Sequence, residues 1–257
     1  MGNLCTSSEV DPPRVSRRSL ASFLPPRELP RLKLALLPSL ERTIQVHERI
    51  SPFASLSVDS FAKKLLQEGM ENKLSLFQVR TVFKKLGLSK SLLEDPDSSF
   101  YQFMVSMREA KLYNLSKLLL AGLLLASGRL SDKAKCLFDH FDEDGNGLLD
   151  AEELTRIVTA IFEVSVMHAP MLALVPESDL GLSELELQQY QHLLNSHKQE
   201  FVADHTALIV NKDKYVTKDL FVTIVLNGEL KSLMWTAELR ECVCRLYIGQ
   251  ENPMLQQ

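Results

Sequence analysis

The residues best suited to chemistry lie in one short stretch that ends at Glu153. Its pattern, D-x-D-x-N-G-x-x-D-x-x-E, places carboxylate and amide oxygens at alternating positions. Gly147 permits the sharp turn that such a chain needs to wrap around an ion. Oxygen donors at this spacing suit a hard divalent cation. The predicted donors are Asp142, Asp144, Asn146, the backbone carbonyl of Leu148, Asp150 and Glu153.

This spacing is that of the twelve-residue calcium loop of an EF-hand. Glu153 is expected to close the site with both carboxylate oxygens, and Asp150 to bind directly or through a water. The bidentate glutamate favours Ca²⁺, although Mg²⁺ could occupy the site at resting calcium concentrations. The alternative, an acidic surface turn, explains neither Gly147 nor Glu153 at its position. We therefore predict one Ca²⁺ site per chain.

Apolar residues at helical spacing flank the loop and predict the helices that position it, Asp132–Phe141 and Ala151–Met167. Leu149, at the eighth loop position, should point into the core and pair by a short β-bridge with a neighbouring loop. Val216 takes the same place in a later loop whose first and last ligand positions hold Ile209 and Leu220, which cannot chelate. We predict that Leu149 and Val216 pair.

Two earlier segments fit the same loop pattern without its ligands. Leu74 takes the eighth position in one of them, with Gln67 and Gln78 at the ligand ends. Leu115 takes it in the other, between Arg108 and Leu119. The distance from Leu149 to Val216 exceeds the other spacings by about thirty residues, which places an insertion near residues 165–200.

These patterns predict an all-α protein with the EF-hand fold, in which two lobes of paired EF-hands carry short β-bridges between their loops. Residues 1–35 are expected to form a flexible, lipidated N-terminal arm. Residues 36–128 would form an N-terminal lobe with two degenerate hands. Residues 129–257 would form a C-terminal lobe with one intact and one degenerate hand. Strand-like runs are short, at Ala207–Val210 and Tyr215–Val216.

The first six residues, MGNLCT, match an N-myristoylation signal. Gly2 follows the initiator methionine, Thr6 stands where the signal requires Ser or Thr, and Cys5 is a palmitoylation candidate. One myristoyl chain attaches a protein only weakly, so a second signal is expected. Residues 10–33 also carry six basic against two acidic side chains, which would attract an anionic lipid surface. The alternative is an unmodified disordered tail.

Composition narrows the functional classes further. A net charge of −4 does not indicate a nucleic-acid-binding protein. A content of 45% apolar and 24% charged residues is ordinary for a globular protein. The apolar run Leu118–Ala126 is too short to cross a bilayer and reads as a buried core helix. No histidine is spaced to pair with a nucleophile, and His140 is expected to face solvent. We therefore expect no enzymatic activity and no small-molecule substrate.

The segment from Lys117 to Phe162 resembles the centre of the neuronal calcium sensor proteins and the related calcineurin B-like group. It has an apolar helix, a short glycine-containing link, a helix of the type LxxKxxxxFxxxD and an intact loop. The resemblance implies four EF-hands, some of them inactive, and a myristoylated Met-Gly start that matches Gly2. Here only one loop retains its ligands.

These observations lead to one expected function and one alternative. The protein would be a calcium sensor or adaptor, cytoplasmic and attached to the membrane periphery by its lipid anchor and basic arm. It would bind an amphipathic helix of a target protein through an apolar groove. Alternatively, it is a constitutive regulatory subunit of a kinase, phosphatase or channel, in which calcium is structural. The three loops without ligands favour this more static role.

Overall fold

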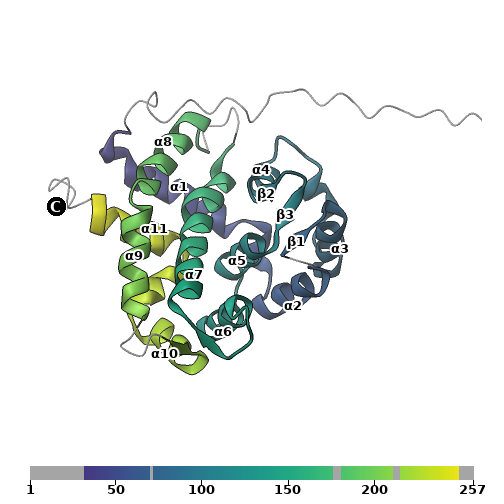
Figure 1. Ribbon diagram of the computed structural model, residues 1–257. Coiled ribbons are helices and arrows are strands. Elements are labelled where there is room, and N and C mark those ends of the chain that lie inside the picture. The colour runs from purple at the N-terminus through teal and green to yellow at the C-terminus, as the bar shows by residue number, and fades with distance from the viewer. Residues whose placement is uncertain (1–31, 70–71, 176–180, 211–214, 249–257) are drawn as a thin grey trace, which may run out of the picture. The chain divides into compact units, whose positions relative to one another are not determined.

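The computed structural model describes residues 32–69, 72–175, 181–210 and 215–248 (Figure 1). The predicted lipidation sites Gly2 and Cys5, and most of the predicted arm, lie outside the described residues. Residues Arg31–Gln257 form one compact unit. The predicted boundary between two lobes at residue 128 stays a prediction.

The first half of this unit alternates helices with very short strands. Three 3₁₀ turns, Leu34–Leu36, Pro52–Ser55 and Lys90–Leu93, connect them. The larger elements are α1 (Leu37–Arg49), α2 (Val58–Glu68), β1 (Lys73–Leu74), α3 (Leu76–Leu86), α4 (Ser99–Ser106), β2 (Arg108–Glu109), β3 (Leu112–Asn114) and α5 (Leu115–Leu125).

The second half repeats this alternation and adds helices. Its first elements are α6 (Leu130–Phe141), β4 (Leu148–Leu149) and α7 (Ala151–Glu163), which continues through a π-helical turn η4 (Val164–His168) and a 3₁₀ turn η5 (Ala169–Ala173). The remaining elements are α8 (Glu184–Asn195), α9 (Lys198–Ile209), β5 (Val216–Thr217), α10 (Lys218–Asn227), the 3₁₀ turn η6 (Glu229–Met234), α11 (Thr236–Val243) and the π-helical turn η7 (Cys244–Ile248). The protein is mostly helical, as predicted.

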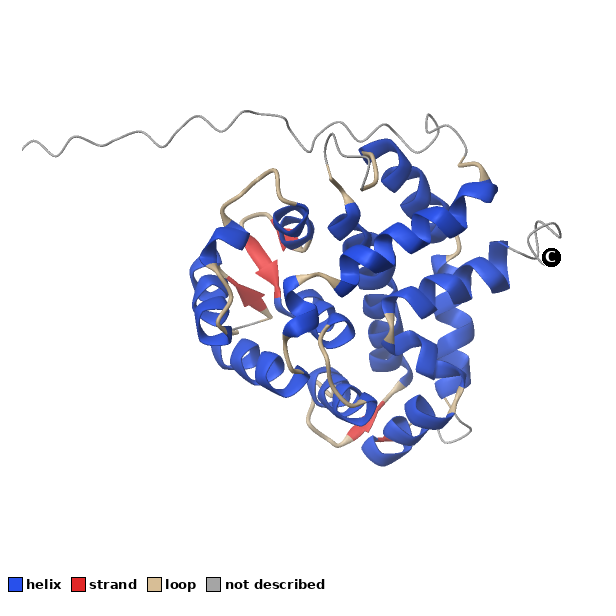
Figure 2. Cartoon of the chain, turned by 180° about the vertical axis from the view of Figure 1, so that it is seen from behind, coloured by secondary structure: helices blue, strands red, loops and turns tan. Residues whose placement is uncertain are grey.

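The strands pair in two separate places (Figure 2). β4 and β5 are antiparallel with Leu149 opposite Val216, so this predicted pairing is confirmed. β3 pairs with both β1 and β2, and Tyr113 lies opposite Leu74. The second loop is therefore in a register two residues earlier than predicted, since Tyr113 takes the place expected for Leu115.

A helix begins directly after each of these loops, and it begins in the same way each time. A fully buried strand residue is followed by an N-cap residue whose side-chain oxygen accepts a hydrogen bond from the third helical N–H, which satisfies a donor that the helix itself cannot. The cap residues are Ser75 for α3, Asn114 for α5, Asp150 for α7 and Thr217 for α10.

The core of the first half is a cluster of phenylalanines. Phe53 lies at its centre, with the rings of Phe61, Phe100 and Phe103 at centroid distances of 5.1, 5.4 and 5.9 Å. α5 crosses beside it, and a Cβ on Gly122 would come within 1.8 Å of the Phe61 ring. The apolar run Leu118–Ala126 is largely buried here, as predicted for a core helix.

One helix in the described part of the chain, Ala151–Ala173, is long and apolar enough to cross a membrane, and 67% of its most apolar window is buried inside the protein. Burial on this scale is what a core helix of a folded protein shows.

The structure differs from prediction near the expected insertion. The run Ala207–Val210, predicted as strand-like, lies at the end of α9, whose buried residues are Phe201, Val202, His205 and Ile209. These residues lie at i, i+1, i+4 and i+8, a helical spacing that the four residues 207–210 are too few to show. Further along the chain, the extended backbone of Trp235 separates η6 from α11.

Candidate metal centre

Two amphipathic helices hold the acidic loop in place. α6 buries Ala134, Leu137, Phe138 and Phe141, and α7 buries Leu154 and four further apolar residues on one face. Helix α6 ends at Phe141, and the cap residue Asp142 leaves helical geometry with ψ of 79°. The loop therefore begins at its first predicted ligand.

The first half of the loop is folded around its own carboxylates. The Asn146 N–H donates to Asp142 Oδ1 at 3.1 Å and to Asp144 Oδ1 at 3.0 Å, and the Gly147 N–H donates to Asp142 Oδ2 at 3.0 Å. The Leu148 N–H in turn donates to Asn146 Oδ1 at 2.7 Å. These hydrogen bonds hold the backbone in the middle of the loop against the side chains at the start of the loop.

Two glycines make this turn possible. Gly145 has φ of 67° and Gly147 has φ of 77°, both in the left-handed region that other residues adopt only at a cost. Gly147 is the glycine that the sequence pattern requires. The structure therefore confirms the mechanical reason for it.

The end of the loop is also the start of α7. Asp150 Oδ1 accepts from the Glu153 N–H at 2.8 Å, and Glu153 Oε2 accepts from the Asp150 N–H at 3.0 Å, which forms a capping box. Glu153 Oε1 accepts from the Glu143 N–H at 3.1 Å. Only 6% of Glu153 is exposed, so both carboxylate oxygens are held toward the loop.

Three of the predicted ligands come together. One carboxylate oxygen from each of Asp142, Asp144 and Glu153 lies within 4.8 Å of the other two. Asp150 lies outside this group and caps α7, and the Asn146 amide donates to Asp144 Oδ2 at 2.7 Å. No other cluster of potential metal ligands of this kind occurs in the described ranges.

The charge of this cluster is not balanced by the protein. Arg156 forms ion pairs with Glu143 at 3.5 Å and Glu152 at 3.2 Å, the two acidic residues of the segment that are not predicted ligands. Within the described residues, none of the three clustered carboxylates has an ion-pair partner. Three oxygens that share a small volume without a neighbouring cation fit a divalent metal ion.

Comparison with known proteins agrees with this geometry. Residues 133–162 match the EF-hand domain family. The chain contains an EF-hand. The match covers most of α6, the loop and all of α7 except its last residue, so both helices that position the ligands belong to this domain. The match indicates calcium binding.

The loop paired with this EF-hand has a different chemistry. Ile209, at the first ligand position, is buried at the end of α9, and Leu220 lies in the first turn of α10. Residues 211–214 lie outside the description. Beside the β4–β5 pairing of the two loops, the adjoining helices α6 and α10 are joined by two contacts. The ammonium of Lys218 lies 2.6 Å from a carboxylate oxygen of Asp139, and the rings of Phe138 and Phe221 lie 6.0 Å apart.

The environment of His140 corrects the prediction that this residue faces solvent. Its ring is half-buried, and Nε2 lies 2.7 Å from Ser116 Oγ, which also lies 2.8 Å from Asn72 Oδ1. Burial lowers the pKa of His140, against the opposing effect of Glu143. The sequence carries no signal for this contact, because Ser116 lies 24 residues away on α5.

Proposed function

We propose that the protein is a calcium-binding sensor or adaptor that is held at the cytoplasmic face of a membrane and regulates a target protein. The observation that carries the calcium half is the uncompensated group of Asp142, Asp144 and Glu153 inside an EF-hand match. Asn146, the Leu148 carbonyl and Asp150 would complete the set of oxygen donors.

The binding event has a clear structural consequence for the EF-hand. Phe141 and Leu154, at the two ends of the loop, are buried in the core. A shift of α6 relative to α7 on binding would change the packing of both side chains and expose apolar surface to an amphipathic helix of the target. This is the step by which calcium would act on a partner.

The membrane half of the proposal rests on the sequence. Gly2 would carry a myristoyl group and Cys5 a palmitoyl group, and the basic residues of the arm would attract anionic lipid. Because a single myristoyl chain binds weakly, the second signal would decide how long the protein stays on the membrane.

A titration of calcium into the apo-protein by calorimetry tests the calcium site. We expect one site with a dissociation constant on the order of 10⁻⁷ to 10⁻⁵ M, the range of sensor EF-hands. Glu153→Gln should lose most of the binding, since it removes one charge and the bidentate closure. Glu152→Gln is the matched control, because Glu152 is 81% exposed and pairs only with Arg156 among the described residues.

Two results would contradict this assignment. One is a stoichiometry of two or more tight sites, which would mean that a loop without carboxylates binds calcium. The other is an equal loss of affinity in Glu152→Gln and Glu153→Gln, which would mean that general negative charge, and not the clustered carboxylate, holds the ion.

The second candidate function is a constitutive regulatory subunit in which calcium only stabilises the fold. The constitutive role is favoured because the described residues contain a single carboxylate cluster. A protein with one calcium-binding loop has only one EF-hand whose helices calcium can rearrange. Affinity purification of the tagged protein with calcium and with chelator separates the two. A partner captured equally in both conditions supports the constitutive subunit, and a partner captured only with calcium supports the sensor.

The location is tested by fractionation of cells that express Gly2→Ala or Cys5→Ser. We expect Gly2→Ala to release the protein to the cytosol and Cys5→Ser to weaken its attachment. A wild-type protein that is soluble and carries no acyl group on mass analysis would refute the membrane half and leave the calcium half intact.

A further inference from the structure

A pocket of about 450 Å³ lies on the surface formed by α1, α5 and α11. Its volume falls within the range of about 300 to 1,000 Å³ that is typical of ligand sites. Leu124 and Leu125 at the end of α5 and Trp235 before α11 supply apolar lining. Glu48, Glu238 and Glu241 supply carboxylates. The pocket is separate from the calcium loop, which contributes no residue to its lining.

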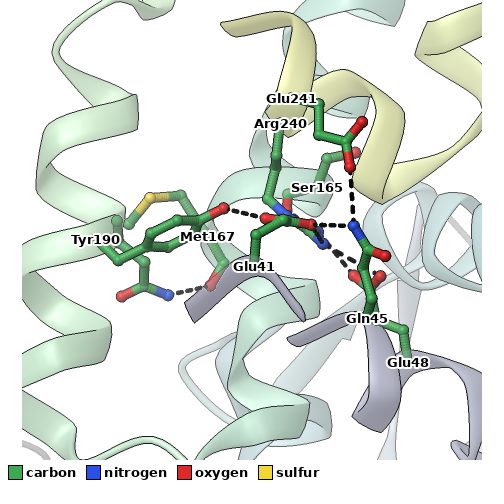
Figure 3. A network of polar contacts seen from close by, with 9 residues as sticks. Glu41, Gln45, Glu48, Ser165, Met167, Tyr190, Arg240 and Glu241 are labelled. Atoms are coloured by element: carbon green, nitrogen blue, oxygen red, sulfur yellow. Dashed lines mark hydrogen bonds and ion pairs between the residues drawn. The ribbon is translucent and has the colours of Figure 1, made fainter. Parts of the chain in front are cut away.

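The pocket carries an excess of negative charge. Glu238 and Glu241 are exposed, and neither has an ion-pair partner within the described part of the chain. Glu48 is paired with the buried Arg240, but that guanidinium is shared with Glu41 (Figure 3). The ammonium of Lys133 also lies against the lining residue Trp235. The four glutamates are thus accompanied by Arg240, the exposed lining residue Arg49 and Lys133, and a net charge of about −1 remains.

The acidic side is held in position by direct contacts. Gln45 donates from its amide to Glu241 Oε1 at 3.0 Å and to Glu41 Oε1 at 3.2 Å, which links α11 to α1 (Figure 3). Glu48 receives hydrogen bonds from Arg240 at 2.7 and 3.2 Å. A site whose groups are fixed before binding loses less entropy when a ligand arrives.

The aromatic wall of the pocket already has one cation of the protein on its ring. The ammonium of Lys133 lies 4.1 Å from the centroid of the Trp235 ring, although Lys133 is not part of the pocket lining. The ring itself lines the pocket and is only half-buried. An aromatic face beside carboxylates is the combination that an arginine side chain recognises, since its planar guanidinium stacks on rings and donates to carboxylates in pairs.

We propose that this pocket binds an arginine side chain of an amphipathic segment of the target protein. The inference rests on the proposed function as an adaptor and adds the chemistry of the partner. The guanidinium would pair with Glu238 and Glu241 and stack on Trp235, while apolar neighbours of the arginine would contact Leu124 and Leu125. The excess of carboxylates argues for a basic protein segment and against an anionic lipid surface at this site.

Trp235 makes the proposal directly measurable, because it is the only tryptophan of the chain. The full-length, calcium-loaded protein is titrated with a helical peptide built of leucine and arginine while tryptophan emission is recorded. Calcium loading neutralises the acidic loop, which could otherwise attract the peptide. We expect a saturable change in emission, and no change with a peptide in which glutamate replaces every arginine.

The variant Glu238→Gln/Glu241→Gln should weaken peptide binding on the order of tenfold, since two rim charges are removed. The control is Glu184→Gln/Glu200→Gln, which removes two exposed charges from α8 and α9 and should bind like wild type. Thermal melts establish that both variants are folded. Equal weakening in both variants would overturn the proposal, as would equal binding of the arginine and glutamate peptides.

An emission change with anionic lipid vesicles and none with the arginine peptide would also overturn it, in favour of a membrane-facing surface. The comparison of the two variants does not depend on the calcium assignment, because neither variant changes a residue of the acidic loop. If calorimetry shows no calcium site but the peptide binds as expected, the pocket proposal is supported and the proposed calcium-sensor function is refuted. If calcium binds at one site and the peptide does not, only the pocket proposal fails.

Discussion

Removal of the buried guanidinium of Arg240 should cost more stability than any other single charge deletion in the described chain. Arg240 is 0% exposed and donates to Glu41 at 2.7 and 3.0 Å, to Glu48 at 2.7 and 3.2 Å, and to the carbonyl of Ser165 at 3.0 Å (Figure 3). Tyr190 also donates to Glu41. The cluster thus joins α1, α8, α11 and the π-helical turn after α7.

Arg240→Met keeps much of the volume but leaves two glutamates facing each other in a buried site. Removal of one partner from a buried ion pair costs about 3–5 kcal/mol. Since a domain is stable by only about 5–15 kcal/mol, a large part of the free energy of unfolding should be lost. Urea denaturation followed by circular dichroism measures it. Arg245→Met is the control, because Arg245 is exposed in the next turn and should change stability by less than about 0.5 kcal/mol.

The loss of stability in Arg240→Met should depend on pH in a defined direction. Burial alone would raise the pKa of Glu41, but the charge of Arg240 and the hydrogen bonds from Arg240, Tyr190 and Gln45 outweigh it, and the pKa is lowered. The contribution of Glu41 is therefore full above the unfolded pKa of about 4.3 and is lost as the pH falls through the lower folded value. Without Arg240, burial should raise this pKa. The stability difference between wild type and Arg240→Met should then shrink as the pH falls from 7 toward 4.

The triple variant Arg240→Met/Glu41→Leu/Glu48→Leu separates the charge effect from packing. Replacement of a complete buried ion-pair cluster by apolar residues is often neutral or stabilising, so the triple variant should recover most of the loss. A cost below about 1 kcal/mol for Arg240→Met, or a difference that does not change with pH, would refute the reasoning, since the guanidinium would then not be buried against two carboxylates in solution.

Three further substitutions follow from the structure. Burial lowers the pKa of Lys133 to about 8, so the wild type bears a cost for its buried ammonium at pH 7 that disappears as the amine loses its proton. The stability of Lys133→Met relative to wild type, measured by urea denaturation, should therefore fall as the pH rises from 8 to about 10.5, and a difference that does not change with pH would contradict this. Gly122→Ala should lower the melting temperature and reduce the free energy of unfolding by about 1–3 kcal/mol or more, because the added Cβ would lie 1.8 Å from the Phe61 ring. An unchanged melting temperature would contradict this contact. Gly147→Ala should reduce the free energy of unfolding by about 1 kcal/mol and weaken calcium binding in calorimetry, because the φ of 77° at Gly147 disfavours a residue with a side chain. An unchanged calcium affinity would show that the loop tolerates another geometry.

The calcium loop could be predicted from the sequence because all of its requirements are local. Carboxylates, glycine and the buried eighth residue lie within twelve positions, and the pairing of Leu149 with Val216 follows from the same local pattern. The register of the second loop could not be chosen by apolar residues alone, since Tyr113 and Leu115 are two positions apart and both are buried. The cap residue Asn114 between them, at the start of α5, is the signal that would have decided it.

The buried cluster could not be predicted in this way. Arg240 stands between Leu239 and Glu241 in a short polar helix, where the sequence is typical of a surface arginine. Its carboxylate partners lie 199 and 192 residues earlier in the chain. Contacts at such distances depend on how α1 and α11 pack, and no local pattern encodes that packing.

Fold and metal binding make different demands on the same loop. The fold needs a buried strand residue and a cap, and the described structure retains both before α3, α5, α7 and α10. The metal also needs a carboxylate at the third helical position, which is Glu153 in α7. The equivalent residues of the other three helices are Gln78, Lys117 and Leu220. A loop can therefore lose its ion and still start its helix.

This separation predicts how Glu153→Gln behaves without calcium. In α3, Gln78 already completes a capping box, with its Oε1 accepting from the Ser75 N–H at 2.8 Å, so glutamine at this position supports a helix start in the same protein. With chelator, Glu153→Gln should unfold within about 0.5 kcal/mol of wild type, as expected for a substitution that keeps the cap. With calcium at about 100 times its dissociation constant, wild type alone should gain about 2.7 kcal/mol. A variant destabilised by more than about 1 kcal/mol in chelator would mean that the Glu153 carboxylate is needed for the fold itself, and its loss of calcium binding would then no longer identify a ligand.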